Sequence, residues 1–309
     1  MKYIELNTTA KMPVIGLGTW RFDSGKAYQA IRWALKLGYT HFDCAPIYGN
    51  QAEIGQAFHD AFIEENIKRE DLFITSKLWN DNHAPENVFP ALEQTLKDLQ
   101  LEYLDLWLMH WPVAQKHGID MPHDENDMIP LTELPLETTW AEMEKAFNSN
   151  KVKAIGVSNF GIQNLQKLID KGEIAPAVNQ VECHPYLQQN ELIDFCHKNL
   201  IAVTAYSPLG SDTSGTNEAD LLEDAKLIEI SNRLQSTPAQ IALAWQINRG
   251  LCVIPKSAHE NHLRENIAAL NILLDKSDME EINKLNRNYR FISGKSFAFG
   301  DYNVETIFA

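Results

Sequence analysis

Eight short apolar runs, spaced regularly along the chain, constrain the fold more than any other feature of the sequence. They lie at residues 14–20, 40–45, 72–77, 104–110, 152–159, 177–182, 202–207 and 252–257. Segments with helical periodicity occur between them, at residues 26–38, 85–99, 136–150 and 238–250. Because most runs are apolar on both faces, we expect parallel strands that helices cover on both sides.

Eight strand–helix units in about 250 residues fit a closed (β/α)8 TIM barrel, with an open doubly wound sheet as the alternative. The runs start about 25 to 30 residues apart, except after the fourth and seventh, where the spacing is roughly 50. Long loops should therefore follow these strands, at 111–135 and 210–220. Residues 3–14 predict a hairpin before the barrel, and 290–309 a Phe-rich tail without helical period. We expect residues 1–309 to form one domain.

The charge balance restricts the partners of the chain. Its 27 basic and 42 acidic residues give a net charge of −15, which disfavours nonspecific binding to nucleic acid or anionic membranes. Any anionic ligand then needs a local basic patch. No stretch resembles a signal peptide or a membrane-spanning helix. We expect a cytoplasmic monomer with a small-molecule substrate and neither a nucleic-acid nor a membrane partner.

The four cysteines are Cys44, Cys183, Cys196 and Cys252. They are scattered, have apolar neighbours and form no C-x-x-C pair. We expect reduced, buried thiols rather than disulfides or a thiolate metal site.

Polar residues end three successive apolar runs, and a tyrosine follows the first of these. The three are Asp43, Lys77 and His110, and the tyrosine is Tyr48. In a barrel these side chains meet at the mouth. A buried carboxylate is costly without a charged partner, so we expect Lys77 to neutralise Asp43. An ammonium beside a phenol favours the phenolate, so Lys77 should also lower the pKa of Tyr48 toward the working pH.

These residue types can protonate an oxygen atom as negative charge develops on it, which carbonyl reduction requires. Tyr48 would donate the proton, and His110 would hydrogen-bond the substrate oxygen. Taken singly, the Asp43–Lys77 pair could be only a buried salt bridge, and Tyr48 a packing residue. Their occurrence on three successive strand–helix units favours a catalytic site.

Eight stretches carry a family resemblance: MPVIGLGTW, GYTHFDCAPIYGNQAEIG, LFITSKLWN, LDLWLMHWP, VKAIGVSNF, VNQVECHPY, TAYSPLGS and VIPKSAHENHLREN. Through them the chain resembles the aldo-keto reductases, including the aldose reductase, aldehyde reductase and polyol-phosphate reductase-like branch, over nearly its full length. The resemblance implies a (β/α)8 barrel that uses a nicotinamide cofactor without a Rossmann domain. The one glycine-rich stretch, from Gly16, indeed lacks a third glycine at Arg21. By this resemblance, the catalytic tetrad of the family falls on Asp43, Tyr48, Lys77 and His110.

The resemblance also implies that NADP(H) lies across the mouth of the barrel. Its carboxamide would be bound by Ser158, Asn159 and Gln180, and Tyr206 would stack on the nicotinamide ring. Lys256 and Ser257 would hold the 2′-phosphate, and Glu265 and Asn266 would hold the adenine. The expected cofactor contacts are Thr19, Trp20, Ser158, Asn159, Gln180, Tyr206, Ser207, Leu209, Ser211, Lys256, Ser257, His262, Glu265 and Asn266.

The residue types themselves also predict a phosphate site here. A strand that ends in Lys256 and Ser257 before a helix N-terminus offers an ammonium, a hydroxyl and free N–H groups. This is the local basic patch. The family usually has arginine at the position of His262, so the charge there depends on pH. Arg264 offers another charge but is rotated by about 200° on the helix. His259 and His262 lack zinc-motif spacing and a third ligand, so we expect no metal site.

Three tryptophans follow predicted strands and should form an apolar wall around the substrate, beneath the Phe-rich tail. The expected substrate contacts are Trp20, Trp79, His110 and Trp111. The leading hypothesis is an NADP(H)-dependent reductase of aldehydes and ketones, with aldoses and sugar phosphates among its candidate substrates. The alternative is a catalytically idle barrel that binds the nucleotide as a sensor or structural protein. The intact tetrad favours the enzyme.

Overall fold

The computed structural model describes residues 1–65, 67–210 and 220–309. Eight parallel strands form one sheet in the order β12-β11-β10-β9-β6-β5-β4-β3. Each predicted run coincides with one of them, although β5 extends one residue beyond its run. Their bounds are β3 (Leu17–Gly18), β4 (His41–Asp43), β5 (Phe73–Leu78), β6 (Leu106–Met109), β9 (Ile155–Ser158), β10 (Val178–Glu182), β11 (Ala202–Tyr206) and β12 (Cys252–Val253).

Backbone hydrogen bonds join the first strand to the last and close the sheet into a barrel. Gly16 N donates to Val253 O at 2.9 Å, and Val253 N donates to Val14 O at the same distance. At Gly18 an added Cβ would lie 2.7 Å from the carbonyl oxygen of Ile254, so this close approach requires glycine. The open doubly wound alternative is therefore wrong, and the closed (β/α)8 barrel is confirmed.

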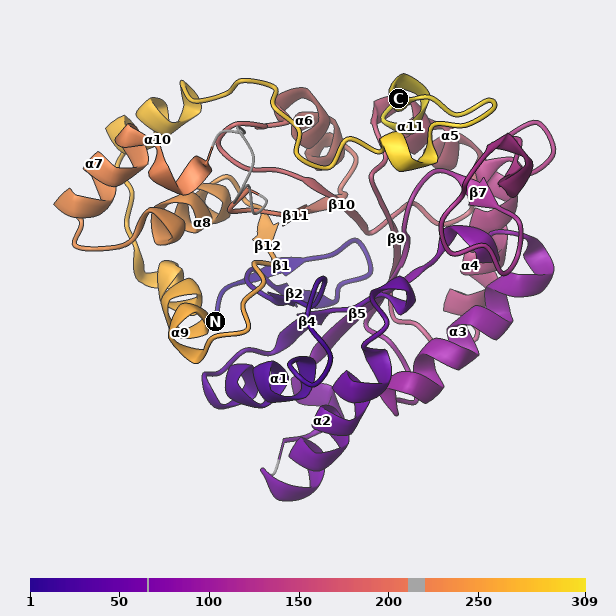
Figure 1. Cartoon of the computed structure of the whole chain (residues 1–309), viewed down its shortest axis with the longest axis horizontal. Coiled ribbons are helices and arrows are strands. Elements are labelled where there is room, and N and C mark those ends of the chain that lie inside the picture. Colours follow the sequence, from indigo (N-terminus) through magenta and orange to yellow (C-terminus); the bar gives the residue numbers. More distant parts are fainter. Residues whose placement is uncertain (66, 211–219) are drawn as a thin grey trace.

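Helices surround the strands, as Figure 1 shows, and the four predicted helical segments are all present. The helices are α1 (Ala27–Lys36), α2 (Gln51–Glu64), α3 (Pro85–Leu99), α4 (Leu136–Asn148), α5 (Ile162–Lys171), α6 (Asn190–Lys198), α7 (Ala225–Arg233), α8 (Pro238–Asn248), α9 (Glu260–Ala268), α10 (Lys276–Asn283) and α11 (Val304–Ile307). Sequence signals fix their starts. For example, Thr237 and Gln240 form a capping box around Pro238, the first residue of α8.

The predicted N-terminal hairpin is present and closes the end of the barrel opposite the mouth. Strands β1 (Tyr3–Glu5) and β2 (Lys11–Pro13) pair antiparallel. Met12 belongs to a buried cluster with Phe73, Leu108 and other residues of the strands. The hairpin therefore supplies the apolar floor beneath the strand layer.

The first long loop and the tail gather around the other end. The loop 111–135 carries a small antiparallel pair, β7 (Ala114–Gln115) with β8 (Met128–Ile129). In the second loop, residues 211–219, with the predicted contact Ser211, lie outside the described residues. The sequence predicted a tail without helical periodicity. The structure nevertheless contains a 3-10 turn (Lys295–Phe297) and α11 there. An Asn303 capping box stabilises the short α11 in place of helical periodicity.

All four cysteines are free and buried, which confirms the expectation for them. Burial raises the pKa of the Cys183 thiol to about 11 and that of the Cys44 thiol to about 12, so both are protonated at neutral pH. Among the residues that the structure describes, no helix combines the length and the apolar character needed to cross a bilayer.

Candidate active site

A cavity of about 800 Å³ opens at the carboxyl ends of the strands and brings most of the predicted site residues together. Those that line it are Thr19, Trp20, Asp43, Tyr48, Trp79, His110, Trp111, Ser158, Asn159, Gln180, Tyr206, Ser207, Leu209 and Lys256. Lys77 lies behind the wall and touches two of the lining side chains. Ser257, His262, Glu265 and Asn266 do not line the cavity and continue the chain from Lys256 into α9.

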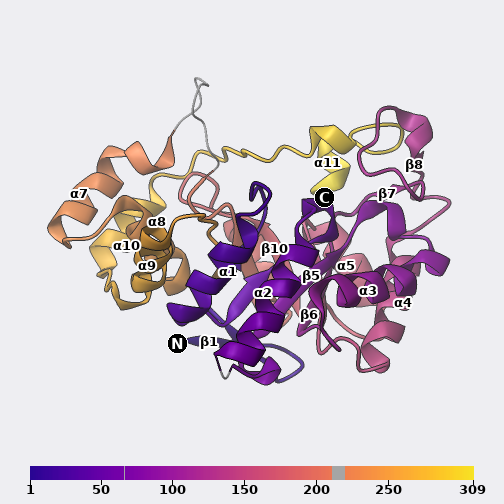
Figure 2. The same cartoon turned by 60° about the horizontal axis from the view of Figure 1, so that its bottom comes forward.

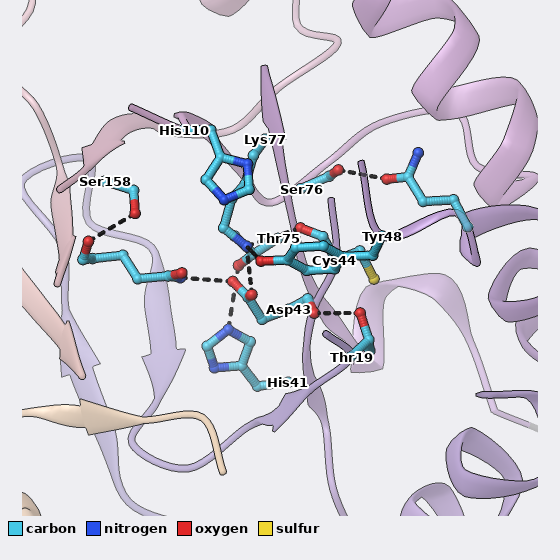
Figure 3. A network of polar contacts seen from close by, with 12 residues as sticks. Thr19, His41, Asp43, Cys44, Tyr48, Thr75, Ser76, Lys77, His110 and Ser158 are labelled. Carbon is cyan, nitrogen blue, oxygen red and sulfur yellow. Dashed lines mark hydrogen bonds and ion pairs between the residues drawn. The ribbon is translucent and has the colours of Figure 1, made fainter. Parts of the chain in front are cut away.

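Asp43 and Lys77 form an ion pair beneath the cavity (Figure 3), with Lys77 Nζ 2.5 Å from Asp43 Oδ1. Their residues are only 2% and 1% exposed, respectively. Lys77 Nζ also donates to the carbonyl oxygen of Cys44 at 3.0 Å, and Gln180 Nε2 donates to Asp43 Oδ2 at 2.7 Å. Both carboxylate oxygens therefore have partners, as two buried charges require.

Tyr48 is placed by a single 3-10 turn that follows β4. The turn spans Pro46–Tyr48 and ends at Gly49, whose φ of 68° is in the left-handed region that favours glycine. Asn50 ties the end of the turn to the first strand, since its Nδ2 donates to the carbonyl oxygen of Thr19 at 2.9 Å. This short, braced connection holds the phenol over the ion pair, and Lys77 Nζ donates to Tyr48 Oη at 3.3 Å.

The ionisation of Tyr48 differs from the sequence expectation. Burial raises the pKa of Tyr48 to about 12, although the Lys77 ammonium acts to lower it. The negative charge of Asp43 offsets part of the ammonium's effect on the phenol. Burial also acts to lower the pKa of Lys77, but Asp43 and Tyr48 raise it by more, so the ammonium stays charged. The predicted lowering of the Tyr48 pKa toward the working pH is therefore wrong for this structure.

His110 follows β6 and faces the same cavity as Tyr48. Its ring centroid lies 5.8 Å from that of Tyr48 and 4.9 Å from that of Trp79, both in edge-to-face geometry. Its backbone N–H donates to the carbonyl oxygen of Leu78, and its own carbonyl accepts from Asn159 Nδ2 at 2.9 Å. Burial and the charge of Lys77 hold the pKa of His110 well below its usual value, so the imidazole is neutral.

The residues predicted to hold the nicotinamide form one hydrogen-bonded group. Ser158 Oγ donates to the carbonyl oxygen of Gln180 at 2.8 Å, and Tyr206 Oη donates to Asn159 Oδ1 at 2.7 Å. Asn159 has a φ of 66°, an uncommon value that turns the chain at the end of β9. The bond from Gln180 to Asp43 joins this group to the ion pair, a link that sequence reasoning missed.

At the predicted phosphate end Lys256 and His262 are exposed, whereas Ser257 is buried. Lys256 Nζ lies 5.1 Å from the ring centroid of Phe22, and Ser257 Oγ accepts from the N–H of His259 at 3.1 Å. The ring of the exposed His262 lies 5.4 Å from that of His259. No group of three or more His, Cys, Asp or Glu side chains that could hold a metal occurs among the described residues.

Arg264, the second charge considered for this end, has a partner on its own helix. Its guanidinium pairs with Glu260 Oε1 at 2.9 Å on the exposed face of α9. The spacing of four residues between them on a helix is a sequence signal for this pair. Arg264 therefore does not replace an arginine at position 262 in this structure.

Several cavity residues were not predicted individually. They are Gly18, Arg21, Asp23, Ile47, Met121, Pro208, Gly210, Ile254, Pro255, Phe291, Ile292, Ser293, Gly294, Ser296 and Phe297. The Phe-rich composition of the tail pointed to the last six only as a group. Phe297 packs 4.9 Å from Trp111 and 5.9 Å from Trp79 between ring centroids, so the tail covers the tryptophan wall.

Comparisons with known proteins agree with this geometry. A family model described as the aldo/keto reductase family matches residues 14–287. The chain is 45% identical over 299 residues to aldo/keto reductase slr0942 of Synechocystis, covering 95% of this chain and 91% of that protein. It is 44% identical over 294 residues to human aldo-keto reductase family 1 member A1, covering 94% and 90%.

Among solved structures, the aldose reductase of Schistosoma japonicum matches with a TM-score of 0.90 and 40% identity, covering 96% of each chain. The fold, the arrangement of the mouth and these similarities lead to the same result. The chain belongs to the aldo/keto reductase family.

Proposed function

We propose that this protein uses NADPH to reduce aldehydes and ketones to alcohols, with Tyr48 as the proton donor. Membership in the aldo/keto reductase family supports an oxidoreductase that acts on carbonyl groups. The observation that carries the finer proposal is the contact of Tyr48 with the buried Lys77–Asp43 pair in a cavity that His110 also faces. Each of these side chains has a role that this chemistry requires.

The cavity suits a nicotinamide dinucleotide. It extends from Trp79 and Trp111 to Lys256, with the amide groups of Asn159 and Gln180 along its wall. Amide groups match a carboxamide, and an exposed ammonium shortly before a helix N-terminus matches a phosphate. When bound, the nicotinamide would supply the hydride. Ser158, Asn159 and Gln180 would orient it, and Tyr206 would lie against its ring.

Tyr48 carries a proton throughout the physiological range, because burial holds its pKa near 12. As negative charge grows on the substrate oxygen, the phenol donates its proton to that atom. The phenolate that remains lies against the ammonium of Lys77, which stabilises it. Asp43 holds the ammonium in place, so the charge that favours proton release is oriented before the substrate arrives.

His110 would position the substrate. A neutral imidazole keeps one N–H to donate and adds no charge that competes with Lys77. Trp79 and Trp111 are almost fully buried around it and exclude water from the reacting carbonyl. We also propose NADPH in preference to NADH, because the exposed ammonium of Lys256 lies where a 2′-phosphate would bind.

Replacement of Tyr48 by phenylalanine tests this proposal. Tyr48→Phe should lower kcat by about 100-fold or more, whereas the Kd for NADPH should stay within about 2-fold. Cofactor absorbance with an aromatic aldehyde measures turnover, and quenching of protein fluorescence measures binding. Tyr186→Phe is the matched control, because Tyr186 is a buried phenol that donates to Asp224 outside the cavity.

Near wild-type turnover in Tyr48→Phe would refute the assignment of the proton donor. A wild-type protein that binds NADPH but reduces no member of a panel of aldoses, sugar phosphates and aromatic aldehydes would support the alternative, an idle nucleotide-binding barrel. The same panel, compared by kcat/KM, would identify the substrate class. A single-domain, cytoplasmic monomer remains part of the proposal, and gel filtration tests the oligomeric state.

A further inference from the structure

Glu182 is a fully buried carboxylate for which the proposed mechanism has no use. It is the last residue of β10, two positions after Gln180, and its side chain is 0% exposed. A buried negative charge is costly unless hydrogen bonds or a charged partner compensate it. Its partners therefore indicate what the residue does.

The carboxylate of Glu182 binds the backbone of the C-terminal tail, more than 100 residues away in sequence. Oε1 accepts from the N–H of Phe291 at 2.7 Å, and Oε2 accepts from the N–H of Ile292 at 2.8 Å. Oε1 also lies 2.9 Å from Nε2 of His184, which is itself buried and whose ring lies 5.1 Å from that of Phe291. Both oxygens thus hold one point of the tail.

That point is where the tail reaches the mouth of the barrel. Phe291 and Ile292 line the large cavity, and the residues after them continue along its rim to Phe297. Figure 2 shows the tail, in yellow, crossing the barrel from α10 to α11. Beyond Phe297 a second anchor holds it, because Tyr302 Oη donates to the carbonyl oxygen of Ile129 and accepts from the N–H of Ala114.

The segment between the two anchors has a different kind of contact with the barrel. Phe297 packs against aromatic rings, whereas Glu182 fixes the backbone through two directional bonds to a charged acceptor. Ring contacts allow a chain to slide, but two adjacent N–H bonds define its position and direction. Glu182 therefore sets the register of the residues that cover the substrate half.

We propose that Glu182 is a positioning residue for substrate selection, which acts through the tail and not on the reacting atoms. This inference rests on the proposed carbonyl reduction for its effect on substrates, but the anchor itself does not depend on it. Loss of the anchor should loosen residues 291–297. Bulky substrates that need the covered pocket should then bind less well, while small aldehydes and the cofactor should be little affected.

Glu182→Gln keeps the shape of the side chain but replaces one acceptor oxygen by an NH₂ group that faces a backbone N–H. Hydrogen exchange at Phe291 and Ile292, measured by mass spectrometry without substrate, should accelerate by about 10-fold or more. The KM for an aromatic aldehyde should rise by about 5-fold or more, with kcat for a small aldehyde and the Kd for NADPH within about 2-fold of wild type.

Glu144→Gln is the matched control. Glu144 is another buried carboxylate that accepts a backbone N–H, from Ile174 at 2.8 Å, and neither residue lines the cavity. Its substitution should lower stability without any change in KM. Glu182→Ala should show the exchange effect more strongly. If it does not fold, Glu182→Gln alone decides the question.

Unchanged exchange at residues 291 and 292 in Glu182→Gln would overturn the anchor. Equal losses for all aldehydes together with weaker NADPH binding, or the same KM change in Glu144→Gln, would overturn the role in selection. A wild-type protein without carbonyl reductase activity would refute the proposed function instead. The exchange measurement would still decide whether Glu182 holds the tail.

Discussion

Two lysines, one behind the wall of the cavity and one lining it, show two ways in which the protein holds a positive charge. Lys77 is buried and touches Asp43, the carbonyl of Cys44 and Tyr48. Lys256 is exposed and lies over the ring of Phe22. A charge that assists proton transfer must be oriented in advance, and burial makes it strong. A charge that binds a phosphate can stay hydrated until the ligand arrives.

The largest expected difference between the two lysines is in stability. Lys77→Met should destabilise the fold by about 3–5 kcal/mol, because it leaves the carboxylate of Asp43 buried and unpaired. Lys256→Met should leave the free energy of unfolding nearly unchanged. Urea denaturation of both variants without cofactor measures the difference.

Asp43→Asn in the Lys77→Met background removes the orphaned charge and should restore part of the lost stability. If the two lysine variants unfold at the same urea concentration, the contrast between the buried and the exposed charge fails. If the double variant is less stable than Lys77→Met, the pair is not what stabilises this region.

The next largest expected effect is on cofactor preference, and here Lys256 is the lysine that matters. Lys256→Met should reduce the preference for NADPH over NADH by about 10- to 100-fold in Kd, the size of one charge-assisted contact. Its kcat at saturating NADPH should stay near that of wild type, because Lys256 is not part of the group that Asp43, Lys77 and Tyr48 form. Titrations with both cofactors, followed by fluorescence, measure the preference. Equal selectivity in wild type and variant would contradict a phosphate site at Lys256.

Acid should lower the free energy of unfolding through two buried histidines. Burial lowers the pKa of His41 to about 4 and that of His83 to about 3, both from an ordinary value of 6.5. As the pH falls below 6.5, the unfolded chain takes up protons that the folded protein cannot. The free energy of unfolding should therefore fall by about 1.4 kcal/mol per pH unit for each such histidine, down to its folded pKa.

His83→Asn isolates this effect, because neither ring nitrogen of His83 has a hydrogen-bond partner within the described chain. Between pH 6 and 4 the dependence of unfolding free energy on pH should become shallower by about 1.4 kcal/mol per pH unit. Urea titrations at several pH values provide the measurement. An unchanged dependence would show that His83 is protonated in the folded protein.

The smallest expected effect is a change in cofactor preference caused by substitution of the exposed His262. His262→Arg places a permanent charge near Lys256 and should widen the preference for NADPH by up to about 10-fold. Because Arg264 pairs with Glu260, it does not already supply that charge. His262→Gln is the control for the change in size. A preference that narrows in His262→Arg would show that position 262 does not face the phosphate.

The sequence predicted the strand ends well, because an apolar run that stops at Asp43 or Lys77 also marks where a barrel strand reaches the mouth. Two findings could not be read from it. The pKa of Tyr48 depends on how completely distant segments bury the phenol, a sum that no local pattern contains. The bond from Gln180 to Asp43 joins β10 to β4, which are not neighbours in the sheet.

The sequence predicted that the tail forms an apolar cover but not how the tail is held in place. Its phenylalanines indicated an apolar cover, yet the position of Phe291 is set by Glu182, a residue of a strand far away in sequence. Contacts at such sequence separation follow from the finished fold and leave no periodic signal. The pair of Arg264 with Glu260, by contrast, was readable from its spacing alone.

The bond between Gln180 and Asp43 also couples three positions of the chain that lie far apart in sequence. The carboxylate of Asp43 binds Lys77 Nζ through one oxygen and Gln180 Nε2 through the other. Under the proposed mechanism, a substitution at position 43 would therefore affect both the lysine behind Tyr48 and the amide proposed to orient the nicotinamide in a single step. Asp43, Lys77 and Gln180 are therefore coupled, and a change at any one of them should alter the hydrogen bonding of the other two.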